Sequence, residues 1–426
     1  MPQQILTLVS SLGRGGTERV ASNFARAFAH AGHTSAVLAY EGGGMRRTEL
    51  QAAGVDVFAV GEDGTSYEAL EWAARVQPHL VHLHRVGFAT PDLDPLLRTL
   101  RALPTAPVVV ETNVFGKPDT SDGRFLVDIH LMLSAWQLWK WRRWTRTLRP
   151  RPVGVVVPNA VDLAPFAPAP AMARQQLRAQ LGIPNEACLI GCFAQPDPVK
   201  WSRVLFEAFA RVASVHPHAH LLVVGLPRAL HSWIRALPPE VQTRVVSLPV
   251  VSDDVRLNEL YGILDLFVNA GQMGESFGMV YAEALLCHVP VLALGVVHRG
   301  NSAPEVIGPG GYVAATPGDF TRCMLRLVSR PDERVALAQA GFEHIRTHFA
   351  SSIVAEQVLR VASLARSSRG VSLEAALAAE GFRTDLSEPD RKALQERMHG
   401  TPPLWQRAAR TVLHHPTFYR LWSRRS

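Results

Sequence analysis

Two glutamates eight residues apart are the side chains of this sequence best suited to chemistry. They stand in Asn269-Ala-Gly-Gln-Met-Gly-Glu275-Ser-Phe-Gly-Met-Val-Tyr-Ala-Glu283, where an apolar strand pattern ends in a glycine-bearing loop and a helical pattern follows from about Phe277. The free N–H groups and positive dipole end of a helix start attract phosphate. Glu275 can accept hydrogen bonds from sugar hydroxyls beside that phosphate, and Glu283, two turns along, can reach a ribose. For Glu275 alone, a helix cap remains the alternative.

A glycine-rich turn after the first apolar run offers a second anion site. Gly13, Gly15 and Gly16 precede a helical pattern whose apolar face includes Val20 and Phe24. Glycine lets the backbone turn sharply and approach a ligand closely, and the helix start supplies N–H groups. A plain tight turn is the alternative. Because the spacing is not G-x-G-x-x-G, the turn disfavours a nicotinamide dehydrogenase.

The elements that must position these residues form two series of β-branched runs that alternate with helical patterns. This alternation predicts an α/β protein with two Rossmann-like, doubly wound parallel sheets, each covered by helices on both faces. The expected strands are Ile5–Val9, Ala36–Ala39, Val55–Val60, Leu80–His84, Pro107–Glu111, Ile129–Leu133 and Val153–Val157, then Leu189–Phe193, Leu221–Val224, Val245–Val250, Leu266–Asn269, Val289–Ala293 and Gly311–Ala314.

The boundaries follow from a Pro- and Ala-rich stretch at 158–171, which we interpret as a linker. We expect one domain over residues 1–165, a second over 166–348 and a helical extension over 349–426, whose first helix packs back on the N-terminal domain. Neither sheet requires the residues after about 368. Doubly wound sheets bind ligands at the carboxyl ends of their strands, so the active site is expected in a cleft between the two domains.

Composition and charge exclude several classes of protein. Hydrophobic residues make up 47% and charged residues 19% of the 426 residues, which excludes a largely disordered chain. The four cysteines form no C-x-x-C pair and the N-terminus lacks a basic leader, so we expect a cytoplasmic protein with reduced thiols. The net charge of +7 is concentrated in residues 134–152 and 401–426, which argues against general nucleic-acid binding.

These two basic segments also carry aromatic side chains. Trp136, Trp139, Trp141 and Trp144 interleave with basic residues in the first, and Leu404, Trp405, Ala408 and Val412 share a face opposite Arg407 and Arg410 in the second. Basic helices with tryptophan suit an anionic membrane surface, so peripheral contact with the inner face of the membrane is one hypothesis. The alternative is that the tryptophans pack into the first domain and the tail docks on the core.

No metal site is expected. Asp92 and Asp94 form a D-x-D pattern, but they stand where a helix begins, and aspartates there usually act as caps.

Four segments of the sequence resemble motifs of a known family. Glu275 and Glu283, with Ser-Phe-Gly-Met-Val between them, resemble the E-x7-E motif of glycosyltransferase family 4, the retaining nucleotide-sugar transferases of the GT-B fold. Gly-Gly-Thr-Glu-Arg-Val at 15–20, Pro-Asn-Ala-Val-Asp at 158–162 and Ala-Pro-Glu-Val-Ile at 303–307 resemble that family's other landmarks in the same order. The resemblance covers roughly residues 5–365.

The resemblance implies a role for each matched residue. The second domain would bind a nucleotide-diphosphate sugar as co-substrate, with no other cofactor and no metal, and the first would bind a glycan, lipid-linked or small-molecule acceptor. Lys200 would contact the diphosphate, with Gly15 and Gly16 closing on it. Glu275 would contact the sugar and Glu283 the ribose. The residues that would present backbone to the donor are Phe277, Gly278, Met279 and Val280.

Two departures from the family pattern leave alternatives open. Cys192 stands where the family usually has an arginine, and Asn113 stands where it commonly has a histidine facing the sugar. Asn113 cannot act as a base, which makes Glu111 the nearest candidate base in the first domain. The resemblance implies front-face displacement, in which the departing phosphate takes the acceptor proton. A weak or inactive partner protein, and a nucleotide-sugar epimerase, are the competing hypotheses.

Overall fold

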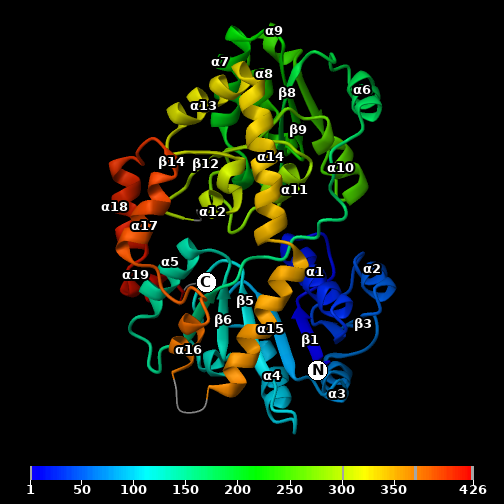
Figure 1. The fold of residues 1–426 in the computed structure, drawn as a ribbon, viewed down its shortest axis with the longest axis vertical. Coiled ribbons are helices and arrows are strands. Elements are labelled where there is room, and N and C mark those ends of the chain that lie inside the picture. Colours follow the sequence, from blue (N-terminus) through cyan, green and yellow to red (C-terminus); the bar gives the residue numbers. More distant parts are fainter. Residues whose placement is uncertain (1, 300–301, 369–371, 424–426) are drawn as a thin grey trace. The chain divides into compact units, whose positions relative to one another are not determined.

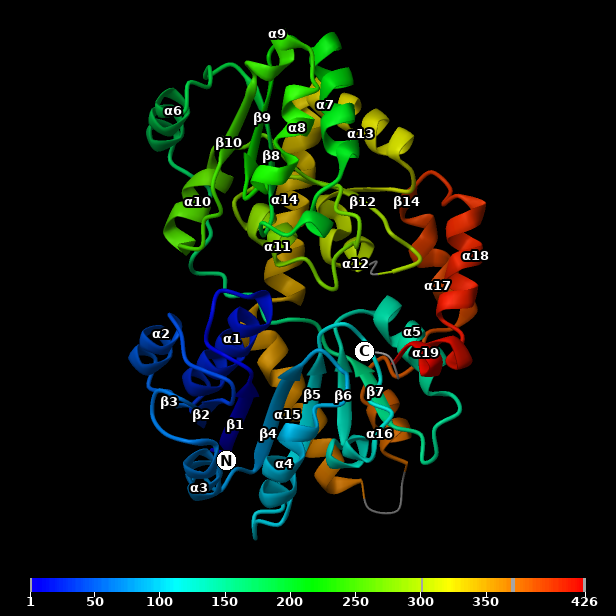
Figure 2. The ribbon, with the colours of Figure 1, turned by 180° about the vertical axis from the view of Figure 1, so that it is seen from behind.

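The computed structural model describes residues 2–299, 302–368 and 372–423. Within these residues the chain forms two compact units. The first comprises the described parts of Met1–Asp162, Phe349–Glu388 and Val412–Ser426, and the second comprises those of Leu163–His348 and Pro389–Thr411. Each unit is built on its own sheet (Figures 1 and 2).

The described residues of the first unit contain a seven-stranded parallel sheet in the order β3-β2-β1-β4-β5-β6-β7. The strands are β1 (Gln4–Val9), β2 (Thr34–Ala39), β3 (Asp56–Ala59), β4 (Leu80–Arg85), β5 (Val108–Asn113), β6 (Ile129–Met132) and β7 (Val153–Val156). The order reverses between β1 and β4, where Leu8 lies opposite Leu83. Ligands of doubly wound sheets bind at such a reversal, beyond the carboxyl ends of the strands.

Both faces of this sheet are apolar because alternate residues of each strand point to opposite sides. Leu38 of β2 belongs to a core with α3 and α4, whereas its neighbours Val37 and Ala39 belong to a core with α1 and α2. The helices of the unit are α1 (Gly16–His30), α2 (Arg47–Ala52), α3 (Ser66–Arg75), α4 (Asp94–Arg101), α5 (Ala135–Thr145), α15 (Ser351–Ser367), α16 (Leu373–Ala379) and α19 (Pro416–Ser423).

The second unit repeats the plan within its described residues, with the strand order β10-β9-β8-β11-β12-β13-β14. Its strands are β8 (Cys188–Phe193), β9 (Ala219–Val224), β10 (Val245–Leu248), β11 (Leu266–Asn269), β12 (Val291–Leu294), β13 (Gly311–Ala314) and β14 (Met398–His399). Here the order reverses between β8 and β11.

The helices of the second unit cover its sheet in the same way. Phe209 of α7 and Met324 of α13 are fully buried against strand residues such as Val223. The helices are α6 (Ala171–Gln180), α7 (Arg203–Val215), α8 (Ser232–Arg235), α9 (Pro239–Gln242), α10 (Asp254–Gly262), α11 (Met279–Leu286), α12 (Ala303–Ile307), α13 (Pro317–Ser329) and α14 (Pro331–His348), followed in the tail by α17 (Glu388–Glu396) and α18 (Leu404–Leu413).

All the strands expected from the sequence are present, so the prediction of two doubly wound parallel sheets is confirmed. One expectation is wrong. The residues after 368 do contribute to a sheet, because Met398 pairs with Val313 and His399 with Ala314 in β14. Two residues are too short to produce an alternating pattern, so the sequence alone could not reveal this strand.

The stretch expected to be a linker is held firmly at its start. Val161 exchanges backbone hydrogen bonds with Phe349 and Ser351, at 2.8 and 2.9 Å. Arg26 of α1 forms an ion pair with Asp162 at 2.8 Å. The helix that follows Phe349, α15, contacts α1 and β5 of the first unit.

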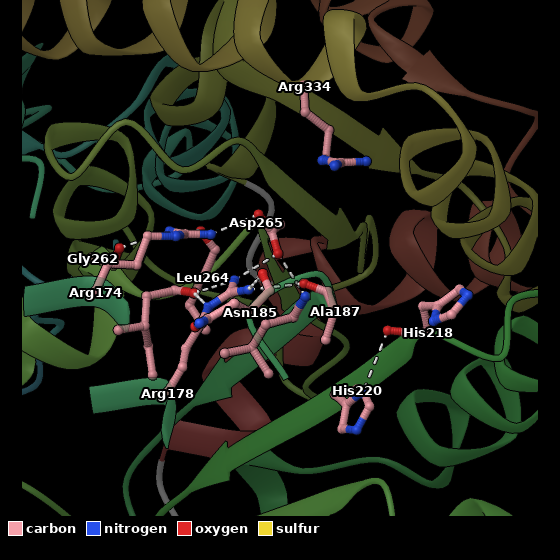
Figure 3. A network of polar contacts seen from close by, with 12 residues as sticks. Arg174, Arg178, Asn185, Ala187, His218, His220, Gly262, Leu264, Asp265 and Arg334 are labelled. Atoms are coloured by element: carbon pink, nitrogen blue, oxygen red, sulfur yellow. Dashed lines mark hydrogen bonds and ion pairs between the residues drawn. The ribbon is translucent and has the colours of Figure 1, made fainter. Parts of the chain in front are cut away.

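Two arginines fix α6 to the amino ends of β8 and β11 (Figure 3). Arg178 and Arg174 donate to the two carboxylate oxygens of Asp265, at 2.8 and 2.7 Å. Arg178 is 2% exposed and also donates to the carbonyls of Ile263, Asn185 and Ala187. This network lies at the edge of the sheet opposite the carboxyl ends, so its role is structural.

We expect Arg178→Met to lower the free energy of unfolding by about 3 kcal/mol, because it leaves Asp265 and several carbonyls without their buried donor. Arg174→Met is the matched control, since Arg174 contacts the same carboxylate from a site that is 28% exposed. It should cost about 1 kcal/mol or less. Urea titration of the full chain measures both, and equal losses would contradict the assigned role.

Candidate active site

The reversal point of the second sheet brings two predicted site residues together. Lys200 lies in the loop after β8, and Glu275 lies in the loop after β11, the neighbouring strand. The Lys200 Nζ is 3.0 Å from Oε1 and 2.8 Å from Oε2 of Glu275. The lysine side chain is 33% exposed and the glutamate 15%, so both border solvent.

Backbone contacts hold these two loops in register. The Gln272 backbone N–H donates to the Val199 carbonyl at 3.2 Å, and its side chain donates to the Trp201 carbonyl at 3.0 Å. Asp197 caps the short 3-10 turn Pro198–Lys200 by accepting from the Val199 N–H. The positions of Lys200 and Glu275 are therefore set by their loops and not by the ion pair alone.

The helix after Glu275, α11, begins at Met279, two residues after the expected start near Phe277. Gly278 precedes it with φ of +92°, and a Cβ atom there would lie 2.4 Å from the Tyr281 ring. This left-handed conformation is open to glycine and interrupts the helix. Phe277 as a whole is 1% exposed, so its ring is packed in the core, and its predicted backbone contact with the donor stays a prediction. Met279 and Val280 form the first turn, whose amides no side chain caps.

Glu283 lies on the buried side of α11. It is 4% exposed, and the Tyr261 hydroxyl donates to its Oε2 at 2.9 Å. This hydrogen bond fixes the direction of the carboxylate. The predicted contact between Glu283 and a ribose stays a prediction.

Cys192, at the position where the resemblance implies an arginine, is an uncharged neighbour of Glu275. Burial, together with the charge of Glu275, raises the pKa of its thiol to about 12, so the thiol is neutral at ordinary pH. The same two influences raise the pKa of Tyr281. Lys200 is therefore the cation that the structure places directly against Glu275.

The glycine turn of the first unit also lies at a reversal point, after β1. Gly15 caps α1 and Gly16 begins it, and both are exposed. A Cβ atom on Gly15 would lie 2.0 Å from a carboxylate oxygen of Glu18. The positive end of α1 thus faces its own glutamate, and an anion arriving there must compete with Glu18. The predicted role of Gly15 and Gly16 toward a diphosphate stays a prediction.

Glu111 occupies a different environment from that of a catalytic base. It is fully buried in β5, where Arg85 contacts Oε1 at 3.2 Å and His130 contacts Oε2 at 2.8 Å. Burial alone would raise the pKa of Glu111, but Arg85 and His130 outweigh it and hold the pKa at about 2. A carboxylate with so low a pKa is a poor base, so this pairing disfavours the predicted catalytic role of Glu111.

Asn113 is likewise turned inward. Its side-chain amide donates to the Lys117 carbonyl at 2.7 Å and accepts from the Lys117 N–H at 3.1 Å. It is 0% exposed, and these bonds close the loop after β5. Asn113 therefore shapes this loop, and its predicted role toward the sugar stays a prediction.

The two basic segments differ from each other. In α5, Trp136 and Trp141 are at most 1% exposed, and Arg142 donates to Glu374 and to the Thr384 carbonyl. The hypothesis that 134–152 presents these side chains to a membrane is therefore wrong, because they pack into the first unit.

In the tail, the apolar side chains of α18 remain exposed. Leu404, Trp405 and Val412 are 75%, 60% and 58% exposed. Arg424 and Arg425, predicted to add charge here, lie outside the described residues. No helix in the described part of the chain combines the length and apolar character needed to span a membrane.

A pair of lysines in the first unit escaped the sequence analysis. Lys140 of α5 is 7% exposed, and its Nζ donates to the Phe115 carbonyl at 3.0 Å. Burial, and then the nearby charge of Lys117, lower the pKa of Lys140 to about 7. The signal available beforehand was only that lysine is rare here, with four in the chain.

Known structures with the same arrangement define the fold. Alr3699/HepE of Anabaena, in complex with UDP and glucose, matches with a TM-score of 0.62 and 18% identity over 85% of this chain and 99% of that one. A glycosyltransferase from Rickettsia africae matches with a TM-score of 0.66 and 15% identity over 86% and 99%. The chain has the GT-B fold, as expected.

Comparison of the sequence with models of known families gives a match for part of the chain. The model of the family described as Glycosyl transferases group 1 matches residues 186–330. Over these residues the chain is similar to the group 1 glycosyltransferases, which supports the resemblance noted from the sequence.

Two curated relatives are similar in sequence to part of this chain. A GDP-mannose-dependent monoacylated alpha-(1-6)-phosphatidylinositol monomannoside mannosyltransferase of Corynebacterium glutamicum is 27% identical over 244 residues, 55% of this chain and 62% of that protein. A D-inositol 3-phosphate glycosyltransferase of Thermomonospora curvata is 32% identical over 220 residues, 46% of this chain and 48% of that protein. The chain thus matches less than two thirds of the length of either relative.

The buried Lys140 generates a prediction about stability and pH. Unfolded lysine holds its proton up to about pH 10, whereas folded Lys140 loses it near pH 7, so the unfolded state binds more protons in between. Wild-type stability should therefore rise by about 1.4 kcal/mol per pH unit from this group between pH 7 and 8.5.

Lys140→Met removes that dependence, and the stability of the variant relative to wild type should fall by about 2 kcal/mol over this interval. Urea titrations at several pH values measure it. Lys392→Met, at an exposed site in α17, is the control and should show no such change. Parallel curves for Lys140→Met and wild type would contradict the prediction.

Proposed function

We propose that this protein is a retaining glycosyltransferase that moves a sugar from a nucleotide-diphosphate donor to a glycan, lipid-linked or small-molecule acceptor. The observation that carries the proposal is the Lys200–Glu275 contact beside the uncapped start of α11, at the reversal point of a group 1 glycosyltransferase domain. This arrangement suits a ligand that combines a sugar with a diphosphate.

The chemistry asked of these residues is charge stabilisation. A diphosphate gains negative charge as its bond to the sugar loosens, and a fixed ammonium and a helix N-terminus stabilise that charge. In the absence of donor, Glu275 holds the Lys200 ammonium in place. When donor binds, the ammonium turns to the diphosphate and Glu275 accepts hydrogen bonds from sugar hydroxyls. Glu283, fixed by Tyr261, supports the nucleoside end.

The proposed mechanism needs no protein base. The sugar–phosphate bond breaks, the acceptor oxygen bonds to the anomeric carbon on the same face, and the departing phosphate oxygen takes the acceptor proton. The buried ion pair between Glu111 and Arg85 agrees with this route, because the pairing stabilises the charged carboxylate and makes it a weaker base. The protein then contributes positioning and electrostatics.

The relatives narrow the range of substrates. Their names state GDP-mannose as a donor in one case and phosphate-bearing inositol compounds as acceptors in two, and the HepE structure contains UDP. We extend to this chain only the shared chemistry, a nucleoside diphosphate sugar and an acceptor with several hydroxyl groups. The reaction is proposed to need no metal and no further cofactor. In the described residues, no three His, Cys, Asp or Glu side chains are grouped to hold an ion.

The ion pair makes a prediction that separates the roles of its partners. Lys200→Ala should weaken binding of UDP or GDP at least tenfold, because the cation is lost. Glu275→Gln should bind the same nucleotide at least as tightly as wild type, because the carboxylate no longer neutralises Lys200, yet transfer or slow hydrolysis of the sugar donor should fall at least a hundredfold. Calorimetry of the nucleotides and product analysis measure the two effects.

A screen of nucleoside diphosphates and then of their sugars identifies the donor for this experiment. No binding of any common nucleotide by wild type would overturn the proposal. Nucleotide binding without hydrolysis or transfer would favour the inactive-partner alternative, which Cys192 and Asn113 motivated. Interconversion of the sugar without an acceptor would favour an epimerase.

Peripheral contact with an anionic membrane is proposed for the tail alone. The exposed side chains Leu404, Trp405 and Val412 lie on a helix that also carries Arg407 and Arg410. Apolar residues can enter the headgroup region while arginines meet anionic lipids. Such contact would place the enzyme at the inner face of a membrane, where lipid-linked acceptors are found.

We expect Trp405→Glu to reduce binding to vesicles that contain phosphatidylglycerol at least fivefold, because it puts a carboxylate in the apolar face. Co-sedimentation at two salt concentrations measures binding. The control is Tyr67→Glu, at an exposed aromatic residue in α3 of the first unit. Equal binding by wild type and Trp405→Glu would remove the membrane from the proposal.

A further inference from the structure

The loop between β11 and α11, which carries Glu275 and which we call the donor loop, is contacted by the loop that follows β12. Ser302, which precedes α12, is 0% exposed, and its hydroxyl donates to the Ser276 carbonyl at 2.5 Å. The guanidinium of Arg299 contacts the Sδ atom of Met273. Ser276 directly follows Glu275 and Met273 precedes it by two residues, so the two contacts flank the glutamate along the chain.

The loop after β12 is itself packed into the second unit at its start. Val296 is 5% exposed and Val297 is 0% exposed. The Gly295 N–H donates to the Ala314 carbonyl of β13 at 2.8 Å. The position of this loop is therefore set by the core and the sheet at its start, and it is joined to the donor loop through Ser302.

The C-terminal part of the chain docks on this same loop. Residues 398–411, which we call the tail segment, comprise β14 and most of α18. The ring of Trp405 in α18 lies 5.2 Å from the ring of His298, centre to centre, with the two planes at 58°. His298 immediately precedes Arg299, and all these residues belong to the second unit. The tail segment thus contacts the loop after β12 beside a residue that touches the donor loop.

Specific contacts fix the tail segment in this place. The His399 carbonyl accepts from the Ala315 N–H at 2.8 Å, and the His399 ring lies 4.1 Å from the Tyr312 ring. Gly400 then turns the chain with φ of +92°, and a Cβ atom there would lie 2.1 Å from a carboxylate oxygen of Asp319. Glycine adopts this conformation without strain. In Figures 1 and 2, β14 and α18 lie next to each other in the second unit, and the turn between them sets where α18 begins.

The helix of the tail segment contributes little to the core. Trp405 is 60% exposed, and each residue of α18 is at least partly exposed. The stability that burial provides is roughly proportional to the apolar area removed from water. Because α18 buries little of it, we expect the contact between Trp405 and His298 to act locally, on the loop after β12.

We propose that Ser302 and the tail segment position Glu275 for its contact with the donor sugar. The inference rests on the proposed function, since the sugar contact of Glu275 is assigned there. Ser302 acts through the Ser276 carbonyl. Trp405 acts through His298 and the loop after β12. Neither is proposed to touch the substrate, so both are positioning residues. Because a displacement of about 1 Å in a reacting group can slow catalysis strongly, loss of either contact slows the reaction of the sugar.

The same arrangement separates the reaction of the sugar from the binding of the nucleotide. The bonds that hold the Lys200 loop, made by Gln272 and Asp197, lie within the loops after β8 and β11. A shift of the loop after β12 therefore acts on Glu275 more than on the lysine assigned to the diphosphate. Variants that lose the positioning contacts should react slowly with the sugar donor and bind UDP or GDP as wild type does.

The first experiment compares two buried serines. Ser302→Ala should lower kcat for transfer or donor hydrolysis about tenfold and change the Kd of UDP or GDP less than about twofold. Ser35→Ala is the matched control, because Ser35 of β2 is 3% exposed and its hydroxyl has no hydrogen-bond partner among the described residues. It should leave both values unchanged. An unchanged kcat in Ser302→Ala, or an equal loss in Ser35→Ala, would overturn the inference.

The second experiment tests the tail segment without vesicles, which keeps it separate from membrane contact. Trp405→Ala should lower kcat about threefold, and Trp405→Phe, which keeps an aromatic ring beside His298, should restore most of it. The control is Thr411→Ala, at an exposed residue of the same helix. Equal kcat in wild type and Trp405→Ala, or the same loss in Thr411→Ala, would overturn the inference. Because Trp405 is exposed, this test stays valid if Ser302→Ala fails to fold.

A double variant shows whether the two residues act through one loop. Substitutions that act on the same element are not additive. The protein with both Ser302→Ala and Trp405→Ala should therefore lose kcat about tenfold, as Ser302→Ala does alone, and not the roughly thirtyfold that independent effects would give. A thirtyfold loss would overturn the action of the tail segment through this loop.

Hydrogen exchange separates this inference from the proposed function, because it needs no substrate. Trp405→Ala should raise the exchange rate of donor-loop amides at least threefold, while amides of β8 and β9 exchange as in wild type, since local contacts control local opening. Unchanged exchange in the donor loop, or faster exchange throughout the unit, would overturn the inference even if the protein transfers sugar. Absence of transfer and hydrolysis by wild type would count against the proposed function, and the exchange rates would still decide the coupling.

Discussion

The contact between Lys200 and Glu275 is the interaction on which the candidate site depends. It joins the loops that follow β8 and β11, the two strands between which the order of the second sheet reverses. An ammonium held by a carboxylate at such a point is already oriented and partly desolvated, which is why we propose it as the partner of a donor diphosphate. The backbone bonds of Gln272 keep this geometry when the pair opens.

The first unit contains a separate cluster of buried charged side chains. Its β4–β6 strands bury Arg85, Glu111, His130 and Asp119 together, and mutual pairing offsets the cost of removing these charges from water. This paired cluster lies beneath the loop after β5, in which Asn113 closes on the backbone of Lys117.

Particular residues show which features could be predicted from sequence patterns and which could not. The strands were predictable because parallel strands buried on both faces leave continuous β-branched runs. The E-x7-E spacing placed Glu275 and Glu283 on one loop and helix. The same approach did not predict the contacts of Glu111 and Asn113, since a strand-end position does not reveal whether a side chain points inward to Arg85 or to a loop backbone. It also missed β14, which is two residues long.

The sequence by itself determined the two sheets, the glycine turns and the identity of the lysine and glutamate at the second reversal point, because these depend on local periodicity and on motifs contiguous in the chain. Only the tertiary structure decided which polar groups became partners. Arg85 with Glu111, Lys140 with the Phe115 carbonyl, and the burial of Trp136 and Trp141 all join segments distant in sequence. Such pairings are set by how strands and helices pack, and no local pattern encodes them.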